Sequence, residues 1–187
     1  MMKRFPRLRV LPLQLAMLSL LAGAPARSAD LPLERSVKAA FLSKFIGFVE
    51  FAAGTSAADP ITIGLLGADD IAGELKRILM ARPQNQRAVL VRTLGRDEPL
   101  TGVHMLFVGG DQSEHVAQVI SAAARQGILT VTEADSGLRQ GSTINFRRVD
   151  DRVRFEVSLP AAQKSNVKLS ARLLAVAYHV QKDGQAP

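Results

Sequence analysis

Short apolar segments alternate with segments of helical periodicity through the middle of the chain. The apolar segments have the length and composition of buried strands and lie at residues 61–66, 88–91, 103–108 and 128–132. Between them, apolar residues recur at spacings of three and four, as on one face of a helix, in residues 71–79 and 111–126. This alternation predicts a single α/β domain with a largely parallel central sheet and helices on both faces.

An aromatic helix is expected before the first of these strands, from Ser36 to Ala52. Its apolar stripe consists of Val37, Phe41, Phe45, Phe48 and Ala52. Four of the eight Phe residues lie between Phe41 and Phe51. The simplest interpretation is that this face packs on the domain's own sheet. A groove for a partner or a pocket for an apolar ligand is the alternative.

The last third of the chain has a different pattern. Residues 143–148 and 152–159 flank Val149, Asp150 and Asp151, a sequence typical of a hairpin turn. Apolar and polar residues alternate strictly along the second arm, so one of its faces should be buried. We therefore expect an antiparallel hairpin at the edge of the sheet. The apolar spacing of residues 169–180 predicts a final helix.

The start of the chain has the order of a secretory signal peptide. Basic residues precede residues 10–26, which carry no charge, and small residues surround Ala26 and Ser28. We predict a cleaved Sec-type signal at 1–28 and a domain at 29–187, located in the periplasm. The apolar segment is shorter than the roughly 20 residues that a spanning helix needs. No second long apolar segment follows, so the mature chain is not expected to span a membrane.

Composition and charge narrow the class of protein. The 187 residues carry a net charge of +7, which suggests a nucleic-acid partner. Five of the 24 basic residues and no acidic ones lie in the expected leader, so 19 remain against 17 acidic residues, a net charge of +2. No nucleic-acid partner is therefore expected. The absence of Cys excludes disulfides, thiolate metal sites and a cysteine nucleophile.

Motifs for cofactors and catalysis are weak. The loop 64–70 joins a strand to a helix, but its glycine spacing does not match the dinucleotide fingerprint. Asp69 or Asp70 is expected to cap the helix rather than bind phosphate. His104 is expected as a satisfied core residue and His115 as an exposed one. Without clustered ligands we expect no metal and no cofactor, and without a Gly-x-Ser-x-Gly motif no residue pattern supports catalysis.

One polar pair could bind an anion. Arg172 and His179 lie seven residues apart on the predicted final helix, almost one above the other. Together they could hold a carboxylate or a phosphate. The simpler interpretation is a solvated helix face opposite Leu173 and Val180.

Three groups of segments carry a resemblance to a known family. The first is VKAAFLSKF, continuing to VEF, in residues 37–51. The second runs from ITIGLLG at residues 61–67 to VHMLFVG at residues 103–109. The third combines GSTINF, RVRFEV and LSARLL between residues 141 and 174. In order and spacing, residues 37–180 resemble the YfiR-like periplasmic proteins.

The resemblance implies a regulatory protein that is not an enzyme. Such a protein binds the periplasmic sensor part of a YfiN-like diguanylate cyclase in the inner membrane and inhibits the cyclase. This inhibition lowers the level of cyclic di-GMP and reduces biofilm formation. The surface candidates for the partner are Phe48, Phe51, Arg172 and His179. Association into a homodimer stays open. The alternative function is a periplasmic small-molecule binder with an anionic ligand near Arg172 and His179.

Overall fold

The computed structural model describes residues 27–51, 59–83, 86–110 and 113–183. The predicted signal peptide, 1–28, lies outside the described residues except for its last two positions, where the first helix begins.

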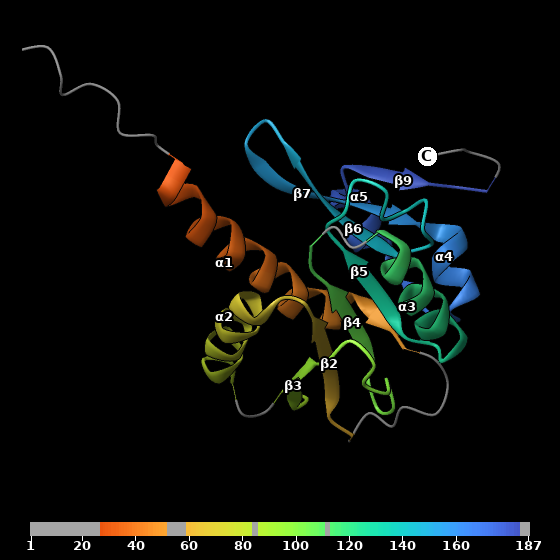
Figure 1. Cartoon of the computed structure of the whole chain (residues 1–187), viewed down its shortest axis with the longest axis horizontal. Coiled ribbons are helices and arrows are strands. Elements are labelled where there is room, and N and C mark those ends of the chain that lie inside the picture. The colour runs from red at the N-terminus through yellow and green to blue at the C-terminus, as the bar shows by residue number, and fades with distance from the viewer. Residues whose placement is uncertain (1–26, 52–58, 84–85, 111–112, 184–187) are drawn as a thin grey trace, which may run out of the picture.

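A mostly parallel sheet forms the centre of the molecule (Figure 1). Among the described residues it has seven strands in the order β3-β2-β4-β5-β6-β7-β9. They are β2 (Ile61–Leu66), β3 (Val89–Leu94), β4 (Met105–Val108), β5 (Leu129–Thr132), β6 (Ile144–Val149), β7 (Arg152–Ser158) and β9 (His179–Gln181). Only the β6–β7 pair is antiparallel, so the predicted α/β fold class is confirmed.

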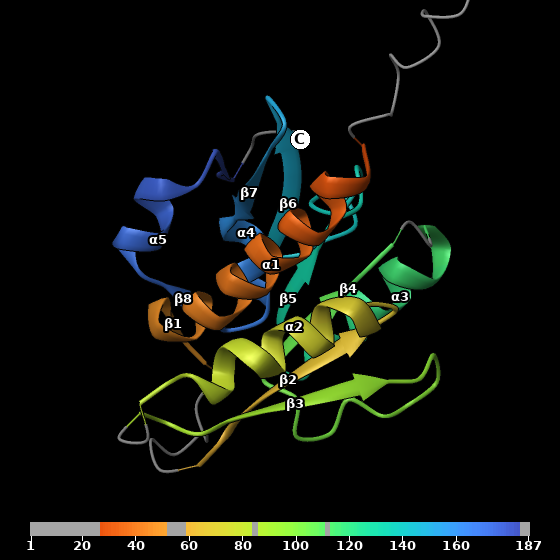
Figure 2. The same ribbon diagram turned by 90° about the vertical axis from the view of Figure 1, so that its left-hand side faces the viewer.

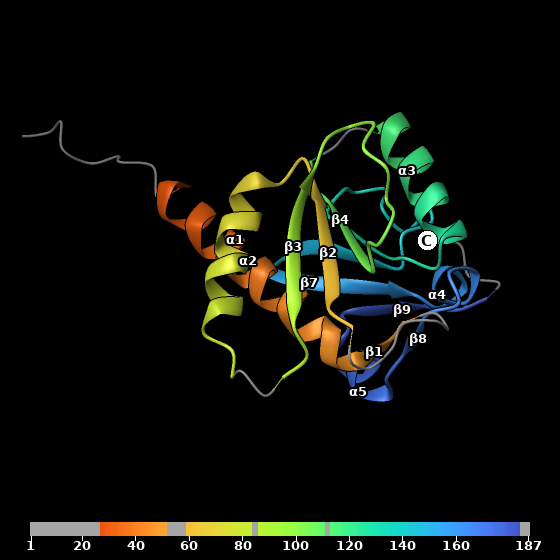
Figure 3. The same cartoon turned by 90° about the horizontal axis from the view of Figure 1, so that it is seen from below.

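Helices cover both faces of the sheet (Figures 2 and 3). One face carries α1 (Arg27–Phe45) and α2 (Asp69–Met80), and the other carries α3 (Ser113–Arg125). The alternation of side chains along β4 shows the two layers directly. Met105 and Phe107 belong to the core beneath α1 and α2, whereas Leu106 and Val108 pack with α3.

The aromatic face of α1 packs on the domain's own sheet, as the simplest interpretation predicted. Phe45 is 1% exposed, and its ring centroid lies 6.0 Å from that of Phe146 and 5.2 Å from that of Phe155. Phe41 contacts the same two rings at 6.0 and 5.5 Å. These contacts fix α1 across the antiparallel pair β6–β7.

The first helix ends earlier than predicted, at Phe45 instead of Ala52. A 3-10 turn (Ile46–Phe48) follows, and β1 (Val49–Glu50) then pairs antiparallel with β8 (Lys168–Leu169). The reason is a contact distant in sequence: the backbone carbonyl of Phe48 accepts a hydrogen bond from the Ser170 amide at 2.9 Å. Extended backbone at Val49 completes this small second sheet.

The prediction of a final helix is right, but its extent of residues 169–180 is wrong. The segment contains β8, the short helix α5 (Ala171–Val176) and strand β9. Ala177 adopts an extended conformation that ends the helix, and the Tyr178 amide then donates to the Phe155 carbonyl at 2.8 Å. The hairpin was expected at the edge of the sheet. This is wrong, because β9 pairs with β7 and forms the edge instead.

The hairpin itself is confirmed. Asp150 and Asp151 have φ angles of 48° and 56°, the left-handed conformation that a two-residue turn between twisted strands requires. The second arm is followed by an element that the sequence analysis missed, α4 (Leu159–Lys164), which Ser158 caps by accepting from the Ala161 amide.

Truncation of Phe45 tests the role of this packing. Phe45→Ala should lower the free energy of unfolding by about 3 to 5 kcal/mol, because the cavity lies among aromatic rings that cannot close around it. Met80→Ala, at a side chain that is 85% exposed, should change it by less than about 0.5 kcal/mol. Urea denaturation followed by circular dichroism measures both, and equal effects would contradict the assignment.

Candidate functional site

The carboxyl ends of β2 and β4 form a topological switch point. The chain leaves β2 through α2 to reach β3 on one side, and then returns to form β4 on the other side. In open α/β sheets the connections diverge at such a point, and ligands bind in the crevice there. A ligand site is therefore expected at this edge of the sheet.

Two glycines bring the loops above β2 and β4 into backbone contact. Gly67 has a φ of +66°, which favours glycine. A Cβ atom on Gly109 would lie 2.7 Å from the carbonyl oxygen of Gly67, too close for any side chain. The Gly109 amide also donates to the Leu66 carbonyl at 2.9 Å. The two loops are thus held together by their backbones.

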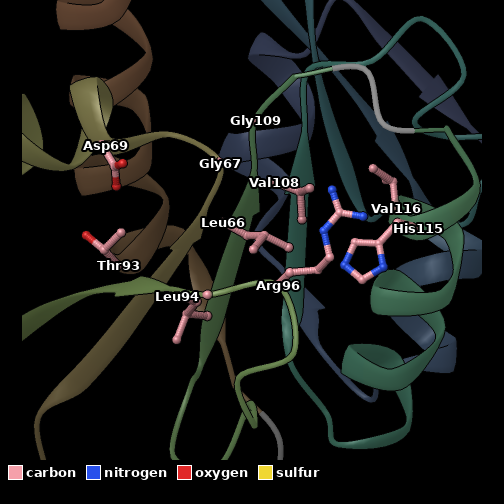
Figure 4. Close-up of a pocket in the computed structure, with 11 residues that line it drawn as sticks. Leu66, Gly67, Asp69, Thr93, Leu94, Arg96, Val108, Gly109, His115 and Val116 are labelled. Atoms are coloured by element: carbon pink, nitrogen blue, oxygen red, sulfur yellow. The ribbon is translucent and has the colours of Figure 1, made fainter.

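A cavity of about 380 Å³ lies beside this contact (Figure 4). Its lining comes from the ends of β2, β3 and β4 and the loops that follow them, from the start of α2 and from the first turn of α3. The lining residues are Leu66, Gly67, Asp69, Thr93, Leu94, Gly95, Arg96, Val108, Gly109, His115 and Val116. Most of this wall is apolar, with a small number of polar groups.

His115 is one of these polar groups, which corrects the expectation of an exposed residue. The ring is partly buried, and its Nε2 atom has no hydrogen-bond partner among the described residues. In Figure 4 the guanidinium of Arg96 lies next to the ring. The sequence did not predict that Arg96 and His115 lie together, because the strands that form the cavity are separate in the sequence.

The aspartates at the start of α2 have different roles from the predicted one. The N-cap position is Ala68, so neither Asp69 nor Asp70 caps the helix. Asp70 accepts from the Ile71 amide at 2.8 Å and pairs with Arg35 of α1 at 2.6 Å. Asp69 lines the cavity instead.

A partly buried ion network connects α1 to the same edge of the sheet. Lys38 Nζ lies 2.7 Å from Glu133 Oε2 and 2.5 Å from Glu34 Oε1, and the lysine side chain is 13% exposed. Glu133 follows β5 directly and accepts from the Gly110 amide at 2.9 Å. Burial lowers the pKa of Lys38, but the bonds to Glu133 and Glu34 outweigh it and raise the pKa above 10.5.

The sequence analysis did not identify this network. Lys38 lies off the aromatic stripe, and only the spacing of four residues from Glu34 hinted at a pair. Its other partner, Glu133, lies at the end of β5, almost a hundred residues later in the chain.

The residues predicted for partner or ligand binding are not brought together as one helix face. Arg172 is exposed in the first turn of α5, and His179 is exposed at the start of β9. Phe48 and Phe51 are half-buried and pack against the main core. The prediction that Arg172 and His179 lie one above the other on a single helix is therefore wrong.

His104 is hydrogen-bonded, as expected, but it is half-buried and not a fully buried core residue. Its Nδ1 accepts a hydrogen bond from the Thr62 amide at 3.0 Å, and its ring centroid lies 6.0 Å from that of Phe51. Burial, with a smaller contribution from the charge of Arg87, lowers the pKa of His104.

Within the part of the chain that the structure describes, no group of three or more His, Asp or Glu side chains could hold a metal ion. Of the helices in the described ranges, none is both long and apolar enough to cross a bilayer.

Comparison with known proteins identifies the family. Residues 35–178 match the family described as YfiR/HmsC-like. The chain belongs to this family. Members of the YfiR/HmsC-like family are known as periplasmic regulators of cyclic di-GMP signalling, and the family is regulatory rather than catalytic. No protein with a curated description matches the chain.

A solved structure supports the fold. The chain is similar to a conserved domain protein from Vibrio cholerae O1 biovar El Tor str. N16961, with a TM-score of 0.54 and 10% identity. The similarity covers 79% of this chain and 60% of that one, so the chain spans about three fifths of the length of the Vibrio protein. At this identity the likeness concerns the fold alone.

Removal of the Lys38 ammonium tests the ion network. Lys38→Met should lower the free energy of unfolding by about 2 kcal/mol at neutral pH, because Glu133 and Glu34 lose their shared partner. Lys44→Met, at an exposed position of the same helix, is the control.

The same pair of proteins gives a pH test. Because folding raises the pKa of Lys38, its contribution is complete below the unfolded value of 10.5 and is lost as the pH rises through the folded value. The stability gap between wild type and Lys38→Met should therefore narrow above pH 10.5, as measured by urea denaturation. A gap that stays constant through this range would contradict the assignment.

Proposed function

We propose that this chain is a periplasmic protein that binds the periplasmic sensor part of an inner-membrane diguanylate cyclase and keeps the cyclase inactive. The match to the YfiR/HmsC-like family over residues 35–178 carries this proposal. In this proposal the chain acts by protein contact and not as an enzyme. Lower cyclic di-GMP and less biofilm would follow.

The order of the N-terminal residues supports export. Residues 1–28 would be the signal that a Sec-type route removes, and residues 29–187 would form the periplasmic domain. The near-neutral charge of that domain also suits a protein partner better than a nucleic acid.

The surface around α5 and β9 is the contact region that we propose. Val176 and Tyr178 have exposed fractions of 67% and 57%, although both are large apolar side chains. The exposed Arg172 and His179 lie at either end of this segment. We call these four residues the α5–β9 surface. Exposed aromatic side chains and arginine are enriched at protein interfaces.

The sheet topology supports the same choice. Strand β9 is the last strand of the sheet, and no further strand pairs with its outer side among the described residues; such an edge can add a strand from a partner. Phe48 and Phe51 are weaker candidates, because they already pack against the core. An anion site at Arg172 and His179 is no longer supported by a shared helix face, so partner contact is the better role for them.

Deletion of the gene tests the regulatory role. Loss of the protein should raise cellular cyclic di-GMP and biofilm formation where the membrane cyclase is intact, because the cyclase would lose its inhibitor. Mass-spectrometric quantification of cyclic di-GMP checks this, with a strain that also lacks the cyclase as control. Unchanged cyclic di-GMP in the single deletion would contradict the proposal.

Substitutions in the α5–β9 surface test the contact region. Tyr178→Ala and Val176→Asp should each weaken binding to the purified periplasmic part of the cyclase by at least about tenfold, as at interface hot spots. Leu90→Asp, at an apolar residue that is also exposed but lies on the opposite edge strand, is the matched control. Equal binding by all three variants in calorimetry would place the contact elsewhere.

A further inference from the structure

We propose that the cavity at the switch point binds a small organic molecule with one carboxylate, held by Arg96 and His115. This inference goes beyond contact with a membrane partner and does not depend on it. A regulator with such a site could respond to a solute in its compartment.

The shape and lining of the cavity suit a molecule with an apolar part. Its volume of about 380 Å³ lies within the range of ligand pockets, about 300 to 1,000 Å³. Leu66, Leu94, Val108 and Val116 line it, and all four belong to or pack against the core beneath α3. The glycine contact between the β2 and β4 loops holds one side of the cavity in place.

The polar groups suit a negative charge at one end. The Nε2 atom of His115 is buried without a hydrogen-bond partner among the described residues, an unfavourable arrangement that a ligand oxygen would relieve. The Arg96 guanidinium lies beside the ring (Figure 4), and its positive charge attracts a carboxylate.

Two observations favour a carboxylate over a phosphate. A phosphate site at a strand end uses free backbone amides, but the Gly109 amide donates to Leu66 and the Gly110 amide donates to Glu133. The carboxylate of Asp69 also lines the cavity and would repel a second negative charge. A single charge next to Arg96 and His115 is therefore the best fit.

Titration of the purified, isotope-labelled mature chain with benzoate tests the proposal by NMR. Benzyl alcohol serves as the neutral ligand with the same ring, and inorganic phosphate as the other anion. Benzoate should shift the amide signals of Leu66, Val108 and Val116 and bind at least tenfold more tightly than either comparison ligand.

Variants connect the binding to the named groups. Arg96→Gln and His115→Gln should each weaken benzoate binding at least tenfold, whereas Arg125→Gln, at an exposed arginine of the same helix as His115, should not. Melting temperatures check that each variant is folded, and either of the two cavity variants suffices for the test.

Several results would overturn the proposal. They are the absence of benzoate binding, equal binding of benzyl alcohol, tighter binding of phosphate, and unchanged affinity in the folded cavity variants. Signal changes confined to the α5–β9 surface would also overturn it. Because the chain is titrated alone, none of these results bears on the proposed contact with a cyclase.

Discussion

The packing of α1 across the β6–β7 pair is the contact on which the rest of the structure depends. Phe41 and Phe45 meet Phe146 and Phe155, so the first described helix joins the antiparallel end of the sheet. The same helix carries Lys38 to Glu133 at the carboxyl ends of the parallel strands. The position of α1 therefore affects both the antiparallel end of the sheet and the carboxyl ends of the parallel strands.

The parallel half of the fold could be predicted from the sequence because its signals are local. Buried strands such as β2 are continuous apolar segments, and α2 and α3 have clear apolar stripes. The C-terminal segment could not be predicted in the same way. Residues 169–180 have helical spacing, but β8 and β9 form because distant backbone groups of β1 and β7 need partners.

The candidate site was even less visible in the sequence. His115 and Arg96 are almost twenty residues apart and belong to different elements, and only the sheet order brings them to one cavity. Asp69 and Asp70 were noticed, but their spacing could not show that one faces the cavity and the other faces α1. Family membership, in contrast, depends on the whole pattern and could be inferred before the structure.

The long-range aromatic contact has a consequence for how the protein is made. Phe45 and Phe155 are separated by more than a hundred positions, so most of the chain must be present before α1 can dock. Contacts this distant in sequence slow folding. For the export proposed above, this delay would favour passage of an unfolded chain, because the core beneath α1 needs both the N-terminal helix and the C-terminal hairpin.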